Sequence, residues 1–177
     1  MEVGVGLPAG VPGAPGDLVL EWARRADSGP FASVGVIDRV AYGNYDPFLS
    51  LAAAAAVTSR LRLVTMVVIG PIRNQAMLAK QAASLDALSG GRLTLGVAIG
   101  ARHEDYDVMG IDHRDRGQRF DAQLAYLREA FQDGGPVGPR PAQPDGPELL
   151  VGGASGRAFA RMARYGDGYV HGGGPPR

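Results

Sequence analysis

The stretch from Asn74 to Gly100 constrains the fold more than any other part of this chain. Its first half has apolar residues at helical spacing, Asn74 stands where a helix N-cap belongs, and Gly90-Gly91 supplies a C-cap. The apolar positions of this helix are Met77, Leu78, Leu85 and Leu88. The second half switches to a short apolar strand formed by Leu93, Leu95, Val97 and Ile99. A helix, a glycine turn and a buried strand form the repeating joint of an α/β protein, whose functional groups lie where strands end.

The rest of the chain repeats this alternation in units of about thirty residues. Hydrophobic patterns predict six strands, at 3–7, 33–37, 61–69, 93–99, 148–151 and 167–170. They predict five helices, which begin near residues 17, 46, 74, 116 and 155. The predicted apolar side of the first helix is Leu18, Leu20, Trp22 and Ala26, and that of the fourth is Phe120, Leu124, Leu127 and Phe131. Such alternation predicts parallel strands, in either a (β/α)8 barrel or an open doubly wound sheet.

Composition limits the functions open to the chain. Its 177 residues are enough for one domain with a real core, and we expect a single domain over residues 1–177. The 18 basic and 18 acidic residues leave no basic surplus, so we expect neither a nucleic acid nor a membrane as partner. Cysteine is absent, which excludes disulfides, thiolate catalysis and cysteine metal sites. No apolar run is long enough to span a bilayer and no basic leader opens the chain, so we expect a cytoplasmic protein.

Four blocks of the sequence resemble a known family. In chain order they are VIDRVAYGNYDPFLSLAAAAAVTSRLRLVT, NQAMLAKQAASLDALSGGRLTLGVAIG, RGQRFDAQLAYLREAF and LLVGGASGRAFARMARYGDGYV. They are similar to the luciferase-like flavin-dependent oxidoreductases, which include bacterial luciferase, alkanesulfonate monooxygenase and deazaflavin-dependent reductases. The resemblance implies an α/β fold of the (β/α)8 TIM-barrel type. This chain departs from it by stopping after the sixth strand, so we expect the last two units, with any cofactor contacts they make, to be missing or not covered.

The same resemblance implies a flavin-dependent oxidoreductase that acts on a small organic substrate. The cofactor would be reduced FMN in a monooxygenase, or the deazaflavin coenzyme F420 in a hydride-transfer enzyme. No catalytic triad or carboxylate pair stands out, as expected when the cofactor carries the chemistry. We expect the substrate to contact the loops 101–114 and 132–147. An incomplete barrel exposes an edge that a second copy would cover, so we expect a homo-oligomer, a dimer.

Residues Gly152, Gly153, Ala154 and Ser155 join the fifth predicted strand to the last helix. Free N–H groups at a helix N-terminus, approached over glycines, make an anion site that suits a flavin phosphate. In the resembling family the corresponding residues lie close to the cofactor. The alternative is a tight turn in which Ser155 is only an N-cap.

Asp38 and Arg39 follow the second predicted strand, on the active side of a barrel. They are candidates for contact with the flavin ring edge or the substrate, Arg39 also for catalysis, and the alternative is a salt-bridged pair at the rim. Deazaflavin enzymes of the family often carry an acidic residue here followed by histidine. Arg39 takes the place of that histidine, so a histidine-based mechanism at this position is in doubt.

Two further strand ends are candidates for cofactor binding. Ile69 and Gly70 precede Pro71, where family members often have a bulge or a non-proline cis peptide under the flavin ring. The alternative is a plain Gly-Pro turn, and Gly70-Pro71 would be the least costly place for a cis bond. Ile99 and Gly100 are small or apolar and suit the floor beneath a flat ring.

His103, on the loop after Gly100, is a candidate catalytic residue that donates a proton or a hydrogen bond near the flavin. The alternative is a solvated loop histidine. His103, His113 and His171 lack metal-ligand spacing, so we expect no metal site.

Two rival interpretations of the whole chain remain open. In the first, the chain is a non-catalytic flavin-binding or structural subunit with an incomplete barrel. In the second, it is part of a longer protein, because HGGGPPR resembles an interrupted loop and a barrel usually needs about 200 residues or more.

Overall fold

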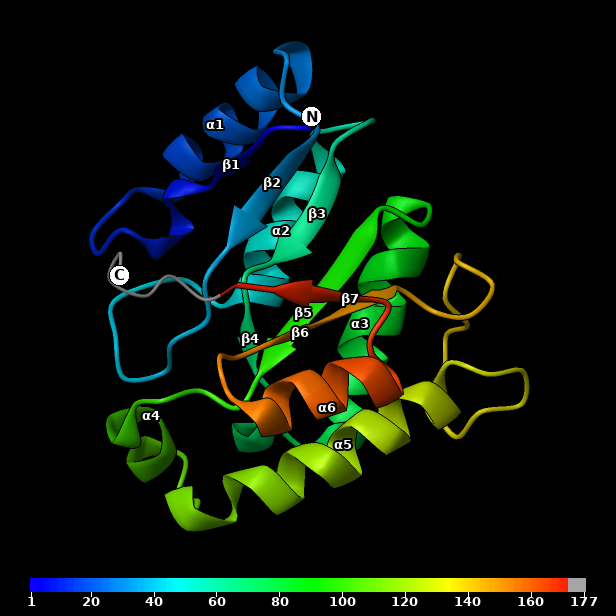
Figure 1. The fold of residues 1–177 in the computed structure, drawn as a ribbon. Coiled ribbons are helices and arrows are strands. Elements are labelled where there is room, and N and C mark those ends of the chain that lie inside the picture. Colours follow the sequence, from blue (N-terminus) through cyan, green and yellow to red (C-terminus); the bar gives the residue numbers. More distant parts are fainter. Residues whose placement is uncertain (172–177) are drawn as a thin grey trace.

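The computed structural model describes residues 1–171, and the predicted interrupted loop lies outside them except for His171. Within these residues one parallel sheet has the strand order β1-β2-β3-β5-β6-β7, with β4 paired to β5. The strands are β1 (Gly4–Gly6), β2 (Ser33–Val36), β3 (Arg62–Thr65), β4 (Val68–Ile69), β5 (Leu93–Ala98), β6 (Glu148–Gly152) and β7 (Gly168–Val170). Successive strands follow a curved surface, as in an incomplete barrel (Figure 1). The predicted truncated barrel is confirmed, and the open doubly wound sheet is not found.

All five predicted helices are present. The α-helices are α1 (Gly16–Ser28), α2 (Pro47–Ala56), α3 (Gln75–Ser89), α4 (His103–Val108), α5 (Arg116–Ala130) and α6 (Gly156–Tyr165). Three short 3-10 helices are η1 (Pro8–Gly10), η2 (Gly70–Ile72) and η3 (His113–Asp115). The predicted caps of α3 are confirmed: the Asn74 side chain accepts hydrogen bonds from two backbone N–H groups, and Gly90 is left-handed with φ 68°. Helix α4 was not predicted, because this polar stretch has no apolar periodicity to reveal it.

The predicted third strand is split in two. Residues 62–65 form β3 and residues 68–69 form β4, so the sheet has seven strands where six were expected. The break falls at Met66-Val67, which is a cis peptide. The bond Gly70-Pro71 is not among the cis peptides, which are Met66-Val67 and Gly138-Pro139. The end of the third predicted strand thus has a non-proline cis peptide, as the resemblance implied, but it precedes Ile69, and Gly70-Pro71 was the wrong place for it.

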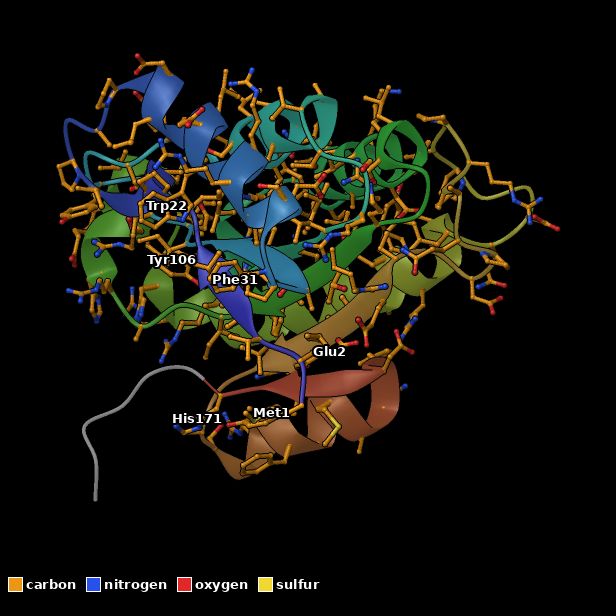
Figure 2. All side chains as sticks on the ribbon, turned by 90° about the horizontal axis from the view of Figure 1, so that it is seen from above. Met1, Glu2, Trp22, Phe31, Tyr106 and His171 are labelled. Carbon is orange, nitrogen blue, oxygen red and sulfur yellow. The ribbon has the colours of Figure 1, made fainter. Side chains whose placement is uncertain are left out.

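The hydrophobic core lies between the helices and the convex face of the sheet (Figure 2). Alternate residues of each strand point into it, as Val34 and Val36 of β2 do, while Ser33 and Gly35 lie on the concave face. The predicted buried positions of α5 are all confirmed, namely Phe120, Leu124, Leu127 and Phe131.

The predicted apolar side of α1 was partly wrong. Val19, Ala23 and Ala26 are buried, whereas Leu18 and Trp22 are 40% and 42% exposed. The buried residues are spaced at i, i+4 and i+7, so they share one helical face. Their small size lets α1 pack closely on the sheet, and the larger apolar residues beside them remain at the surface.

Exposed apolar residues gather on the outer face of α2 and recur on α3, where Gln75 and Lys80 are exposed too. In α2 the exposed residues are Leu49, Ala52, Ala53 and Ala56, and in α3 Met77 and Leu88 are exposed as well. Met77 and Leu88 were expected among the apolar positions of the α3 helix, but only Leu78 and Leu85 of that set are buried. Within residues 1–171, no helix has the length and apolarity needed to cross a membrane.

The loop 132–147 lies at the end of the barrel opposite the carboxyl ends of the strands. Gln143 donates a hydrogen bond of 2.9 Å from Nε2 to the carbonyl of Leu93, the first residue of β5. The same amide and the Gln143 backbone N–H also hold the buried carboxylate of Asp86. The loop follows a helix and enters a strand at its amino end, so the expectation that it contacts substrate was wrong.

Candidate functional site

A cleft of about 670 Å³ lies at the carboxyl ends of β2, β4 and β5. Its lining residues are Gly10, Ile37, Asp38, Arg39, Ala41, Tyr42, Met66, Val67, Ile69, Gly100, Ala101, Arg102, Glu104 and Asp105. Its size is that of a small-molecule or cofactor site. Four predicted site residues meet here, namely Asp38, Arg39, Ile69 and Gly100.

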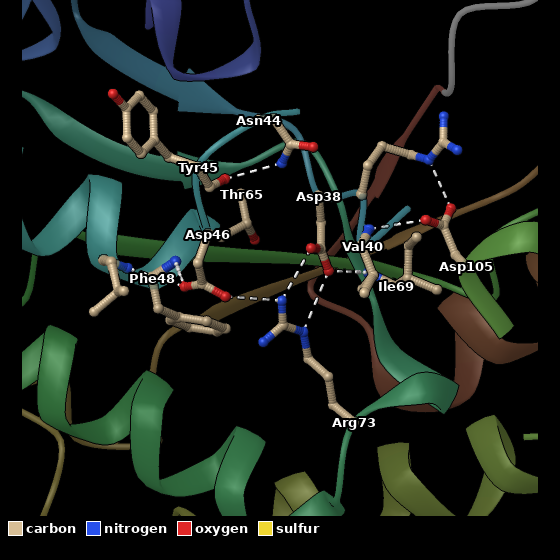
Figure 3. A network of polar contacts seen from close by, with 12 residues as sticks. Asp38, Val40, Asn44, Tyr45, Asp46, Phe48, Thr65, Ile69, Arg73 and Asp105 are labelled. Carbon is tan, nitrogen blue, oxygen red and sulfur yellow. Dashed lines mark hydrogen bonds and ion pairs between the residues drawn. The ribbon is translucent and has the colours of Figure 1, made fainter. Parts of the chain in front are cut away.

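Asp38 is committed to a buried hydrogen-bond network (Figure 3). Its carboxylate accepts the backbone N–H of Ile69 at 2.9 Å and two bonds from Arg73, at 2.9 Å from Nη2 and 3.2 Å from Nε. Only 1% of the Asp38 side chain is exposed. The carboxylate therefore ties the end of β2 to the end of β4, where the floor of the cleft begins.

Arg73 links this network to helix α2. Its Nη2 group also lies 3.2 Å from a carboxylate oxygen of Asp46, the residue whose side chain caps α2. Burial alone would lower the pKa of Arg73, but the neighbouring carboxylates of Asp38 and Asp46 raise it above its ordinary value. The guanidinium is a permanent cation that two acidic residues share.

Asp105, the third residue of α4, holds the strand-end loop after β2. Its carboxylate accepts the N–H groups of Val40 and Ala41 and a bond of 2.6 Å from Nε of Arg39. Burial would raise the pKa of Asp105, but these backbone donors and the Arg39 guanidinium bring it below the ordinary value. Arg39 also donates to Glu104 at 3.0 Å. Asp38 and Arg39 are thus each salt-bridged, but to other residues and not to one another.

Ile69 and Gly100 lie together in the floor of the cleft. Gly100 is left-handed with φ 68°, and a Cβ placed on it would lie 2.7 Å from Cγ2 of Ile69. Gly70 is packed beneath, where a Cβ would lie 2.3 Å from Oε1 of Gln123. Gly70 and Ile99 do not line the cleft, because Gly70 is buried against α5 and Ile99 packs against the main core. Their roles in cofactor binding stay predictions.

His103 lies between two lining residues, Arg102 and Glu104, but does not itself line the cleft. Its ring stacks on that of His113 with centroids 3.7 Å apart, and it is not a lining residue. His113 in turn accepts a bond at Nδ1 from Arg116, which can only donate, so the proton of this neutral ring is on Nε2. Burial, followed by the charge of Arg116 and the neighbouring His103, lowers the pKa of His113. The structure gives His103 a packing partner, and its catalytic role stays a prediction.

Tyr106 anchors the same segment from inside. Its ring is fully buried against His113, and its hydroxyl donates a hydrogen bond to the carbonyl of Ile99. Burial raises the pKa of Tyr106 to about 12, so the hydroxyl keeps its proton. The α4 segment is therefore fixed against β5 and forms a wall of the cleft.

The residues Gly152 to Ser155 flank the cleft at the same rim. A Cβ on Gly152 would lie 3.3 Å from Cβ of Ala98 and 3.6 Å from Cγ1 of Val67, which itself lines the cleft. The Ser155 hydroxyl accepts the N–H of Ala158 at 3.2 Å, so the N-cap is confirmed. Such a cap does not exclude an anion at the remaining first-turn N–H groups of α6.

Arg73 and Arg102 were missed by sequence reasoning. Neither has a local signal, because the partner of Arg73 lies 35 positions away and Arg102 precedes α4, a helix that the sequence pattern did not predict. Asp105 lay within the stretch considered but had no assigned role. Within residues 1–171, no group of three or more metal-ligating side chains is placed to hold an ion.

The fold and the strand-end cleft together define an incomplete α/β barrel with a cleft at its carboxyl rim. The sequence profile of the luciferase-like monooxygenase family matches residues 1–177, and the chain belongs to this family. The resemblance carried by the four sequence blocks is thereby confirmed.

An uncharacterized protein of Mycobacterium tuberculosis is 35% identical to this chain over 189 residues. The match covers 87% of this chain and 65% of that protein, so the chain spans about two thirds of the length of this relative.

Among solved structures, the monooxygenase RslO1 of Streptomyces bottropensis is 28% identical, with a TM-score of 0.80 over 96% of this chain and 59% of its own. Two others share the fold at 21% identity. The oxygenating constituent of 3,6-diketocamphane monooxygenase from Pseudomonas putida, in complex with FMN, has a TM-score of 0.78 over 95% of this chain and 56% of its own. An F420-dependent secondary alcohol dehydrogenase, in complex with an F420–acetone adduct, has a TM-score of 0.79 over 97% and 58%.

Proposed function

We propose that this chain provides the flavin site of a luciferase-like monooxygenase that uses reduced FMN and a small organic substrate. Membership of the family and the cleft at the carboxyl rim support this proposal. The observation that carries it is the floor of the cleft, where Ile69 and Gly100 meet with no room for a further side chain.

The residues of the cleft fit a flat ring system. Val67, Ile69, Gly100 and Ala101 offer an apolar surface at one side, and the missing side chain of Gly100 lets a ring lie against the backbone. The two buried carboxylates nearby, Asp38 and Asp105, are already paired and so present no bare charge to an apolar ring.

Each part of the site has a definable task. Asp38 and Arg73 hold the floor in place, and Asp105 holds the wall formed by α4 against the loop after β2. The first turn of α6, entered through Gly153 and Ser155, would receive the flavin phosphate. Bound flavin would supply two-electron chemistry toward oxygen if it is FMN, or hydride transfer if it is a deazaflavin.

Coenzyme F420 is the second candidate cofactor. Asp38 stands where deazaflavin enzymes of this family often have an acidic residue, and one structural neighbour is an F420-dependent dehydrogenase. A non-catalytic flavin-binding subunit is the rival from another class. Turnover in the presence of bound flavin separates the rival from both enzyme proposals.

The test is a fluorescence titration of the protein with oxidised and reduced FMN and with F420. We expect FMN to bind with a dissociation constant below about a millimolar. Gly153→Asp should abolish binding, because it places a carboxylate against the phosphate. Gly153 has φ 133°, so Gly153→Ala is the matched control that carries the same backbone strain without the charge.

Two outcomes would contradict the proposal. Absence of binding of FMN and of F420 would remove the enzyme interpretation of this chain. Equal losses in Gly153→Asp and Gly153→Ala would mean that backbone strain, and not charge, weakens binding, and the phosphate site would then lie elsewhere.

We also propose that the chain forms a homo-oligomer, a dimer. The exposed apolar residues of α2 and α3 support this, since exposed apolar patches of this kind are typical of interfaces between protein chains.

A further inference from the structure

We propose that the substrate of this site is an amphipathic organic anion, whose charged end is held by Arg102 beside Arg39 and whose apolar body lies in a groove inside the barrel. This inference rests on the proposed function, because it assigns a ligand class to the same site. Two independent features carry it: the unused donors at the rim, and the apolar hollow beneath.

The two buried carboxylates at the cleft, those of Asp38 and Asp105, are already used by partners within the protein. Asp38 and Asp105 are each 1% exposed at the side chain and accept three hydrogen bonds each. Glu104, the third acidic lining residue, accepts a bond from Arg39 at 3.0 Å. A positively charged ligand would have to break the pairs of Asp38 and Asp105. At Glu104 it would meet a carboxylate that already faces Arg39 at 3.0 Å and Arg102 at 3.8 Å.

Donors, in contrast, remain available on two guanidinium groups. Arg39 uses Nε for Asp105 and Nη2 for Glu104, which leaves Nη1 without a hydrogen-bond partner among the described residues. The Arg102 side chain is 64% exposed, and its nearest acidic atom is Glu104 Oε1 at 3.8 Å, beyond hydrogen-bond distance. Both residues line the cleft, so the free donor capacity of its rim matches a carboxylate or a similar anion.

A second hollow, of about 450 Å³, adjoins the cleft on the concave face of β1, β2 and β3. The two spaces share the lining residues Gly10, Ile37 and Met66. Gly6 and Gly35 are paired neighbours on β1 and β2 and line this hollow without side chains of their own.

The concave face of the sheet is polar in one region and apolar in another, and this difference indicates where the apolar end of the ligand lies. Farther along the sheet, Arg62, Thr94 and Glu148 form a hydrogen-bonded polar cluster that spans β3, β5 and β6. The groove over β1 to β3 is instead lined mostly by glycine and apolar residues, among them Leu7, Ile37 and Met66. A ligand with an apolar body below and an anion at the rim satisfies both regions at once.

Methyl-labelled methionine NMR tests this without any flavin. Met66 lines both hollows, whereas Met77 is exposed on α3 and serves as the internal control. The probes are octanoate, n-octanol and acetate, and the Met66 signal is assigned from its loss in Met66→Leu. We expect octanoate to shift the Met66 signal at concentrations roughly tenfold below those for octanol, as one charge-assisted hydrogen bond implies, and acetate to have little effect.

Variants separate the two ends of the ligand. Arg102→Gln should reduce the affinity for octanoate to that for octanol, while Arg24→Gln, which removes an exposed charge on α1, should not. Gly6→Leu should weaken octanoate and octanol alike, because its new side chain would occupy the groove; no atom lies within 4 Å of a Cβ there, so it fits the fold. Gly16→Leu, also without a neighbour within 4 Å, is the control at the start of α1. If Gly6→Leu does not fold, Gly35→Ala places a smaller side chain in the same groove and takes its place in the test.

Equal affinity for octanoate and octanol, or unchanged binding in Arg102→Gln or Gly6→Leu, would overturn the proposal. A parallel titration compares FMN with riboflavin. If Arg102→Gln removes a preference for FMN over riboflavin, the guanidinium binds the flavin phosphate, and the proposal that it binds a substrate anion is refuted. Failure of FMN to bind at all would refute the proposed function, whereas the octanoate result is obtained independently of flavin.

Discussion

Arg73 donates two hydrogen bonds to Asp38 across 35 positions of the sequence, and this buried pair joins the end of β2 to the segment between η2 and α3. Removing the cation should leave an unpaired charge inside the protein. We expect Arg73→Met to lower the free energy of unfolding by about 3–5 kcal/mol, the usual cost of breaking a buried ion pair. Urea denaturation followed by circular dichroism measures it.

The control for this pair is Arg114→Met, which removes a fully exposed partner of Asp112 and should leave stability almost unchanged. The double variant Arg73→Met/Asp38→Asn should recover part of the loss, because the buried charge is gone as well. Additive losses in the double variant would show that the two side chains do not act as a pair.

Asp105 makes stability depend on acidic pH. Its pKa is lower in the folded protein than the value of 3.8 expected when unfolded, so its charged form stabilises the fold. This contribution is fully present above the unfolded value and is lost as pH falls through the folded pKa. Unfolding free energies between pH 7 and pH 2 should therefore converge for the wild type and Asp105→Asn as the solution becomes acidic. A difference that stays constant over this range would contradict the assignment.

Gly100 should resist substitution for two separable reasons. In Gly100→Ala the left-handed backbone costs about 1–2 kcal/mol, and the new methyl group meets Ile69. Gly110→Ala has nearly the same φ, 66°, but no atom within 4 Å of its Cβ, so it isolates the backbone cost. We expect Gly100→Ala to lose more stability than Gly110→Ala in thermal denaturation, and to weaken FMN binding where Gly110→Ala does not. Equal effects on stability would mean that the Ile69 side chain moves aside for the new methyl group without a cost in free energy.

Local signals were enough to predict most elements of this fold. Asn74 and Gly90 cap α3 as expected, because caps depend on neighbouring residues alone. The site depends instead on contacts between residues far apart in the sequence, and nothing near Arg73 indicates that it will pair with Asp38. The exposure of Trp22 was not predicted for the same reason, since the face of α1 that is buried depends on how the helix packs on the sheet. The break of the third strand at Met66 also has no local sequence signal.

The position of loop 132–147 gives a prediction that separates stability from function. Gln143 Nε2 holds the buried Asp86 carboxylate at 2.7 Å, far from the carboxyl rim. Gln143→Ala should lower the free energy of unfolding by about 1–3 kcal/mol, because a buried acceptor loses its partner. Its FMN affinity should equal that of the wild type. Gln132→Ala, at an exposed position of the same loop, is the control, and a change in FMN affinity in Gln143→Ala would place the loop near the site after all.

The exposed apolar residues of α2 and α3 should mediate self-association. Leu49 is 73% exposed in an otherwise alanine-rich helix surface, so Leu49→Asp adds a charge there without disturbing the core. We expect the wild type to elute as a dimer in size-exclusion chromatography with light scattering, and Leu49→Asp to elute as a monomer, because an interface of this kind does not accept an unpaired charge. Leu18→Asp, which adds the same charge to exposed α1, should leave the dimer intact. A monomeric wild type would refute the proposed homo-oligomer, and a dimeric Leu49→Asp would move its interface to another face.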